Sequence, residues 1–152
     1  LRAFEGVSET DGGKRLEPVN SLGWMIGHLA WHEQVVWLTT AQGQTPVPEL
    51  NELATRKPAS TPSIEEMWRA WHTVTQAADR YLDTLTTEQL QDHYEVQGKP
   101  LPEDIGTSLQ RLIYHYWYHL GESQVVRRLL GHTGLYAYVG RWGTIPPYRP
   151  DV

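Results

Sequence analysis

The sequence predicts an all-α protein, folded as a four-helix bundle in a single domain of residues 1–152. Apolar residues recur at helical spacing in several long stretches, and two long connections containing glycine and proline separate the last three of them. A chain of 152 residues is also long enough to bury one substantial core. These observations together favour a helical bundle over an α/β domain.

The chain is expected to open with the end of a first helix, truncated at its N-terminus and stopped by Gly6. Residues 8–18 are polar and contain two consecutive glycines, which predicts a loop. Asn20 or Ser21 can then cap a second helix that runs to about Ala41. Apolar residues occur on nearly all sides of this helix, which indicates that it has neighbours on several faces.

Residues 42–62 contain four prolines and show no sustained period, so we expect a long irregular crossover there. Thr61-Pro62 is predicted to open a third helix that runs to Leu85, with the proline in its first turn. Thr87–Tyr94 is predicted to add a short helix.

A loop over residues 95–104 is expected to lead into the fourth helix. Thr107 has the spacing of a capping box to the glutamine three residues later, which predicts the start of this helix. The helix is expected to run to about Leu130 and to stop at Gly131. Residues 132–152 are rich in aromatic residues and proline, and we expect an irregular tail that packs across the bundle.

Composition excludes several kinds of partner. The formal net charge is −5 and the basic residues are scattered, which argues against a surface for nucleic acid. The most apolar stretch, residues 21–38, carries His28, His32 and Glu33, which a lone membrane span would tolerate poorly. The chain contains no cysteine, so it has neither disulfides nor thiolate ligands, which fits a cytoplasmic protein.

Three histidines have the positions expected of metal ligands. His115 and His119 are four residues apart in the predicted fourth helix, so their rings lie on one face about one turn apart. A transition metal needs a further ligand from another element, and His28 lies in the most buried part of the second helix. A neutral imidazole buried there requires a hydrogen-bond partner or a metal ion.

Spacing alone leaves another interpretation open, in which the histidine pair serves as half-polar core residues of an aromatic helix. His32 can be a group behind the ligands, an outward-facing polar residue or a fourth ligand. The other histidines are expected at the surface or in the core: His72, His93 and His132. No glutamate directly follows His28, so the base of a zinc protease helix is missing.

Two segments resemble the DinB (damage-inducible) superfamily, a group of four-helix metalloproteins that includes bacillithiol- and mycothiol-dependent transferases. They are NSLGWMIGHLAWHE over residues 20–33 and HYWYHLGE over residues 115–122. Members of this family carry one histidine in the second helix and two more, four apart, in the fourth. The resemblance covers the second to fourth helices and implies that His28, His115 and His119 bind one divalent metal ion.

The resemblance also implies an up-down-down-up order of the four helices, which agrees with the long crossover at residues 42–62. Family members are frequently dimers, so a homodimer is a hypothesis for this chain. Leu120 and Glu122 stand where the family usually has arginine and glutamine. Glu122 can orient a metal ligand or pair with a basic residue such as Arg128, and we favour the ion pair.

The function implied by the family is a metal-dependent thiol S-transferase or isomerase that joins a low-molecular-weight thiol to a small electrophile. Three histidine ligands leave a coordination position open for such a substrate. Three imidazoles suit zinc, nickel, copper or iron, and we expect zinc or nickel. Candidate proton acceptors are Glu33 and Glu122, and the expected pocket walls are Trp24, Trp31, Tyr116 and Tyr118.

Two other functions are compatible with the same histidines. The first is a metal-dependent hydrolase that uses metal-bound hydroxide, which requires a carboxylate within reach of that water. The second is a non-catalytic protein of the stress response that binds a metal ion or a small ligand.

Overall fold

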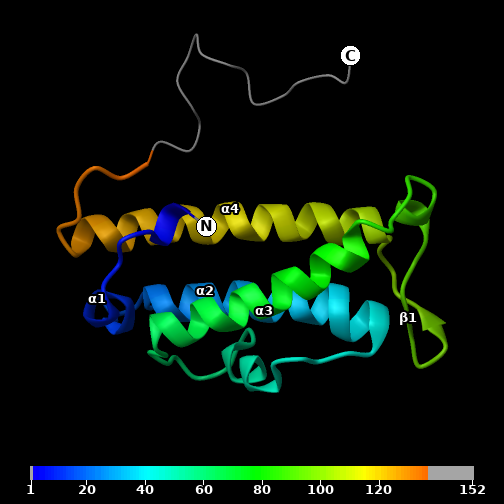
Figure 1. Ribbon diagram of the computed structural model, residues 1–152, viewed down its shortest axis with the longest axis horizontal. Coiled ribbons are helices and arrows are strands. Elements are labelled where there is room, and N and C mark those ends of the chain that lie inside the picture. Colours follow the sequence, from blue (N-terminus) through cyan, green and yellow to red (C-terminus); the bar gives the residue numbers. More distant parts are fainter. Residues whose placement is uncertain (1, 137–152) are drawn as a thin grey trace, which may run out of the picture.

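The computed structural model describes residues 2–136 and confirms that the protein is mostly helical (Figure 1). Its long helices are α2 (Leu22–Glu33), α3 (Ile64–Leu82) and α4 (Ile105–Leu129). A π-helical segment, η2 (Gln34–Thr40), continues α2 without a break. None of the helices in this part of the chain is long and apolar enough to cross a membrane. Residues from 137 onward, which include most of the predicted tail, lie outside the described residues.

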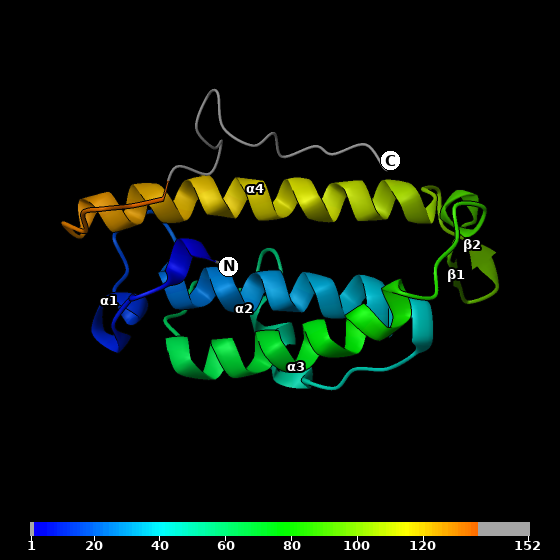
Figure 2. The same ribbon diagram turned by 45° about the horizontal axis from the view of Figure 1, so that its top comes forward.

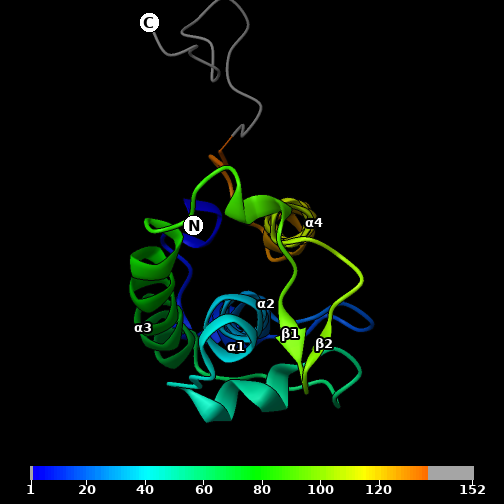
Figure 3. The same ribbon diagram turned by 90° about the vertical axis from the view of Figure 1, so that its right-hand side faces the viewer.

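The three long helices pack with α2 between the other two (Figures 1 and 2). Helices α2 and α3 run in the same direction, because residues 42–62 return the chain to the end where α2 begins. Helix α4 runs in the opposite direction along α2. Viewed along the helices, α3 and α4 lie on different sides of α2 (Figure 3). These are the directions expected for the second to fourth helices, while the complete four-helix order stays a prediction.

The N-terminal region differs in part from the prediction. A short 3₁₀ helix, η1 (Arg2–Phe4), stands where the end of a first helix was expected, and Gly6 follows it with φ +71°. Residues 8–18 were predicted to be a loop, but they contain a short helix, α1 (Glu9–Gly13). The hydroxyl of Ser8 caps this helix by accepting a hydrogen bond from the amide of Asp11.

Helix α2 begins as predicted, because the hydroxyl of Ser21 caps it through the amide of Trp24. Every residue from Leu22 to Ala30 is buried, which confirms that α2 has neighbours on several faces. The crossover is fixed to η2 by two hydrogen bonds between Gln34 and the backbone of Val47, at 2.8 and 3.0 Å. It also contains a 3₁₀ helix, η3 (Pro48–Leu53), and is therefore partly regular.

Helices α3 and α4 both begin at a residue other than the one predicted. Ser63, and not Thr61-Pro62, caps α3, and Asp104, three residues before Thr107, caps α4. In both places several polar residues follow one another, and the residue whose side chain reaches the free amides of the first turn sets the start. Helix α4 ends as predicted, with Gly131 at φ +85°.

Residues 95–104 were predicted to be a loop, but they include a small antiparallel hairpin of β1 (Glu95–Val96) and β2 (Lys99–Pro100). Gln97 and Gly98 both have positive φ, as a tight two-residue hairpin turn requires. Before the hairpin, the predicted short helix at Thr87–Tyr94 is reduced to the 3₁₀ helix η4 (Gln89–Gln91).

The start of α2 lies close to the backbone that leads into α3. A Cβ atom on Gly23 would lie 2.5 Å from the backbone oxygen of Pro62, a distance that only a shift of the main chain can relieve. Gly23 therefore sets the distance between the start of α2 and the start of α3. This packing in turn positions the middle of α2.

We expect Gly23→Ala to destabilise the protein by about 2 kcal/mol, because the added methyl group meets a backbone atom that cannot rotate away. Urea unfolding measures the difference. Gly13→Ala is the matched control, since nothing lies within 4 Å of its Cβ position, and it should be neutral or slightly stabilising. Equal unfolding midpoints for the two variants would contradict the close approach.

Candidate metal centre

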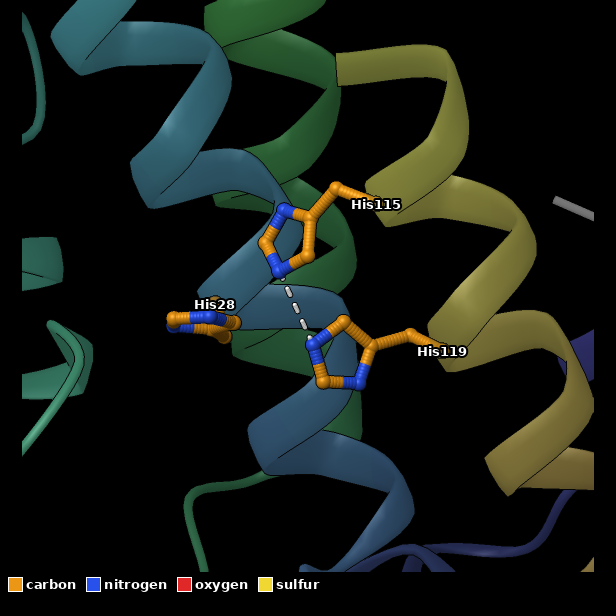
Figure 4. Close-up of side chains that lie close together, drawn as sticks. All are labelled: His28, His115 and His119. Carbon is orange, nitrogen blue, oxygen red and sulfur yellow. Dashed lines mark hydrogen bonds between the residues drawn. The ribbon is translucent and has the colours of Figure 1, made fainter. Parts of the chain in front are cut away.

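His28 lies in the middle of α2, and His115 and His119 lie one turn apart on α4. The antiparallel packing of the two helices brings the three rings together (Figure 4). The ring centroid of His28 is 4.9 Å from that of His115 and 5.2 Å from that of His119. His28 and His119 are each only 4% exposed. The histidines singled out from the sequence therefore meet in a buried position between two helices.

The spacing of the ring nitrogens fits a single metal ion. One nitrogen from each ring lies within 4.8 Å of the other two. The Nε2 atoms of His115 and His119 are 3.0 Å apart. Nitrogen ligands around a tetrahedral zinc ion lie about 3.4 Å from one another, so small side-chain movements would suffice. Three neutral imidazoles are also a donor set that a divalent transition metal accepts.

Hydrogen bonds determine which nitrogen two of the rings present. His28 donates from Nδ1 to the backbone carbonyl of Leu53 at 2.6 Å, and His119 donates from Nδ1 to the carboxylate of Glu122 at 2.7 Å. A carbonyl or carboxylate oxygen can only accept, so both rings carry their proton on Nδ1. Each ring therefore keeps a lone pair on Nε2, the nitrogen available to a metal ion.

The third ring, His115, has His32 as its partner. Their Nδ1 atoms are 2.7 Å apart, so one of the two donates to the other. The Nε2 atoms of His115 and His119 are themselves hydrogen-bonded, so with His119 protonated on Nδ1 the proton between them belongs to Nε2 of His115, and a bound metal ion would replace it. His32 itself is not in the group of residues whose nitrogens converge. The structure therefore places His32 behind the ligands, which was one of the three interpretations of this residue.

Burial keeps three imidazoles at the site neutral, those of His28, His115 and His32. Burial lowers the pKa of His28 to about 4. Burial, together with the neighbouring His119, lowers the pKa of His115 to about 3. Burial also lowers the pKa of His32. Near pH 7 these imidazoles therefore have free lone pairs, as metal binding requires.

Aromatic side chains enclose the histidines. The indoles of Trp24 and Trp31, which lie about one turn before and one turn after His28 on α2, both stack on its ring. Their ring centroids are 4.4 and 5.2 Å from that of His28. Tyr118 meets the ring of His119 edge-on at 5.0 Å. Three of the four expected wall residues thus contact the site. The fourth, Tyr116, lies toward α3, where it accepts a hydrogen bond from the indole of a tryptophan.

Glu122 orients a histidine, contrary to the role favoured from the sequence. Its Oε2 accepts the hydrogen bond from Nδ1 of His119, and its Oε1 lies 3.5 Å from Nδ2 of Asn20. The partner of Glu122 is therefore His119, and the ion pair with Arg128 that the sequence favoured is wrong. Glu122 follows His119 by three residues on the same helical face, so this imidazole is within reach of its carboxylate, whose side chain is 17% exposed.

Glu33 lies in a separate polar chain that joins the three long helices. It is hydrogen-bonded to Tyr116 of α4, whose hydroxyl accepts a hydrogen bond from Trp71 of α3 at 2.8 Å. Glu33 is 8% exposed, and its burial raises its pKa to about 7. These contacts give Glu33 a place in the packing of the bundle, and its role as a proton acceptor stays a prediction.

The other histidines lie elsewhere. His72 is exposed on α3 and stacks on Trp68. His93 lies near the hairpin, with Nδ1 2.8 Å from a backbone carbonyl. His132 accepts a hydrogen bond from the buried Arg127. These positions agree with the surface or core roles expected for them.

The fold and the site define a class of helical protein in which a buried histidine triad between two antiparallel helices could hold a metal ion. The family model of the DinB superfamily matches residues 1–123, so this chain belongs to the DinB superfamily. The matched region contains all three histidines. No curated protein matches the chain.

We expect Glu122→Ala to weaken metal binding by about 10- to 100-fold, because the ring of His119 loses the acceptor that fixes its proton and orientation. Competition with a chromophoric chelator measures the affinity. Glu65→Ala removes a carboxylate that is exposed at the start of α3 and should leave the affinity unchanged. An equal affinity in both variants would show that Glu122 does not support the site.

The raised pKa of Glu33 predicts a pH-dependent stability. The carboxyl titrates at about 7 in the folded chain and at its ordinary value of 4.5 when unfolded, so the folded state binds the proton more tightly. Stability from this group is complete below pH 4.5 and is lost as the pH rises through about 7. The loss should amount to roughly 3 kcal/mol.

The variant Glu33→Gln isolates this effect, since it keeps the shape of the side chain without its charge. Urea unfolding with a chelator present should show the wild type losing stability relative to the variant between pH 5 and pH 8. Contributions from the histidines are common to both proteins and cancel in the difference. Parallel stability curves would mean that Glu33 keeps an ordinary pKa.

Proposed function

We propose that this DinB-superfamily protein is a metal-dependent thiol S-transferase or isomerase, which uses a low-molecular-weight thiol and a small electrophile. The convergence of three imidazoles, two of them fixed by hydrogen bonds at Nδ1, carries this proposal. A set of three protein ligands leaves room for a substrate, as catalytic sites do and structural zinc sites do not. A divalent ion held there would lower the pKa of a bound thiol or water and so supply a nucleophile near neutral pH.

The residues of the chain would have distinct tasks in this reaction. His28, His115 and His119 would bind the ion, and the acceptors at Leu53 and Glu122 would hold two of the rings in place. The indoles that stack on His28 would exclude water from that side of the site. The thiol would come from a second small molecule, because the chain has no cysteine of its own. We propose zinc or nickel as the ion, since both accept imidazole ligands.

The hydrolase alternative has less support from the contacts. A hydrolase needs a carboxylate beside the nucleophilic water, on the side where the Nε2 atoms converge. Glu122 instead contacts His119 at Nδ1, the opposite side of the ring. Its position therefore suits the orientation of a ligand better than the activation of water.

We further propose a homodimer in the cytoplasm. The absence of cysteine supports a reducing compartment. The homodimer is the state that the family resemblance implies.

The decisive test compares the metal content of the wild type with that of two histidine variants. We expect one ion per chain in the wild type and in His72→Ala, and none in His115→Ala. His72 is the matched control because it is an exposed histidine on another helix. Equal metal content in all three proteins would exclude the site.

Turnover with thiols and model electrophiles then tests the activity. The loaded wild type and His72→Ala should convert substrate, and His115→Ala should be slower by a factor of about 100 or more. Hydrolysis without a thiol would favour the hydrolase. A wild type that binds the ion but turns over no substrate would identify a non-catalytic binding protein.

A further inference from the structure

A chain of hydrogen bonds runs through the candidate metal centre and continues beyond it to His32. Nδ1 of His119 donates to Glu122 at 2.7 Å, and the Nε2 atoms of His119 and His115 are 3.0 Å apart (Figure 4). On the far side of the His115 ring, its Nδ1 lies 2.7 Å from Nδ1 of His32. Four side chains are therefore joined by three hydrogen bonds.

The acceptor at one end of this chain fixes the direction of every bond in it. Each neutral imidazole has one N–H group and one lone pair. The carboxylate of Glu122 can only accept, so His119 keeps its proton on Nδ1 and accepts at Nε2. His115 therefore donates from Nε2 and accepts at Nδ1, and His32 donates from its own Nδ1. In the metal-free chain all three bonds point from His32 toward Glu122.

A charged ring at His119 is the alternative to this direction. An imidazolium there would donate from both nitrogens, and His115 would then carry its proton on Nδ1 and donate to His32. His119 is only 4% exposed, and a charged ring costs more to bury than a neutral one. Pairing with Glu122 would offset only part of this cost. The neutral arrangement is therefore favoured.

A divalent ion in the centre requires the opposite direction at His115. Binding needs a lone pair on each converging nitrogen, so Nε2 of His115 must lose its proton. His115 then stays neutral only if it carries a proton on Nδ1, from which it donates to Nδ1 of His32. His32 must accept there, so its own proton has to be on Nε2.

The protons balance in this exchange. The proton on Nε2 of His115 leaves to water, and the proton on Nδ1 of His32 crosses the 2.7 Å bond to Nδ1 of His115. His32 takes one proton from water at Nε2, so each ring holds one proton before and after. His32 is half-buried, which leaves it more accessible to solvent than His28 and His119.

We propose that His32 is a positioning residue for His115, and that the hydrogen bond between the two rings reverses when the centre takes up a divalent ion. The proposal rests on the metal binding that the proposed function requires, and it does not depend on thiol transfer. A side chain without polar atoms at position 32 would leave the Nδ1–H group of His115 without an acceptor. The ring would then no longer be held in the orientation that the ion needs.

Nitrogen NMR of the full chain, with its histidines isotopically labelled, tests the reversal. We expect His32 to carry its proton on Nδ1 in the presence of a chelator and on Nε2 after loading with zinc, which is diamagnetic. His115 should make the opposite change, from Nε2 to Nδ1. The signals of His32 are those that disappear in His32→Asn. A His32 that keeps one tautomer throughout would overturn the proposal, and so would a proton on Nδ1 of His115 before zinc is added.

A matched set of variants tests the positioning role. His32→Phe keeps a ring beside Trp31 without its nitrogens, and His72→Phe makes the same change at an exposed histidine beside Trp68. The ring centroids are 6.0 Å apart in the first pair and 5.8 Å in the second. We expect His32→Phe to weaken zinc binding by about 10- to 100-fold and His72→Phe to leave it unchanged. His32→Asn should restore most of the affinity, because its amide can accept from His115.

Competition with a chromophoric chelator measures these affinities, and urea unfolding without metal shows whether each variant is folded. Equal affinities of His32→Phe and His72→Phe would overturn the positioning role, and so would a loss that His32→Asn does not recover. If His32→Phe does not fold, the spectra of the wild type decide alone. A wild type that binds no zinc would remove both this proposal and the metal centre. Zinc binding with the reversal but without turnover would refute the transferase and leave the role of His32 intact.

Discussion

The site depends on the rule that a polar group removed from water must find a partner inside the protein. Helix α2 is surrounded on all sides, so the imidazole of His28 cannot leave its nitrogens in solvent. One nitrogen is satisfied by the carbonyl of Leu53, and the other faces the two imidazoles of α4. The hydrogen bond to Leu53 therefore offsets part of the cost of burying the ring, and the free nitrogen of His28 is left facing His115 and His119. A metal ion is the partner that satisfies three such lone pairs together.

The same contacts connect elements that are distant in the chain. The hydrogen bond to Leu53 joins α2 to the crossover, and the bond between Glu122 and His119 stiffens one turn of α4. The polar chain from Glu33 through Tyr116 joins α2 to α4 on the other side of the histidines. The contact of Asn20, just before α2, with Glu122 of α4 is a second link between these parts of the chain, and the two links together restrict sliding of α4 along α2. The geometry of the triad is thus maintained by the packing of the bundle as a whole.

The sequence predicted the long helices well, because their apolar residues recur over many turns, and spacing and family resemblance identified the three histidines. The helix starts were less predictable. Thr61 and Ser63 are both good caps, and only tertiary packing decides between them. The role of Glu122 was also misjudged: His119, three residues away, lies on the same face of α4, whereas Arg128, six residues away, does not. No sequence pattern could identify the hydrogen-bond acceptor of His28, because every residue has a backbone carbonyl.

That backbone acceptor has an evolutionary consequence. A side-chain partner can be lost through a single base change, but the carbonyl oxygen at position 53 persists whatever amino acid is encoded there. Substitution of residue 53 is limited only by the need for an apolar side chain in the core. Insertions or deletions in the preceding segment are different, because they would move the oxygen away from the imidazole while leaving every histidine in place. Among related chains, the length of this segment is therefore a more telling record of a preserved site than the identity of residue 53.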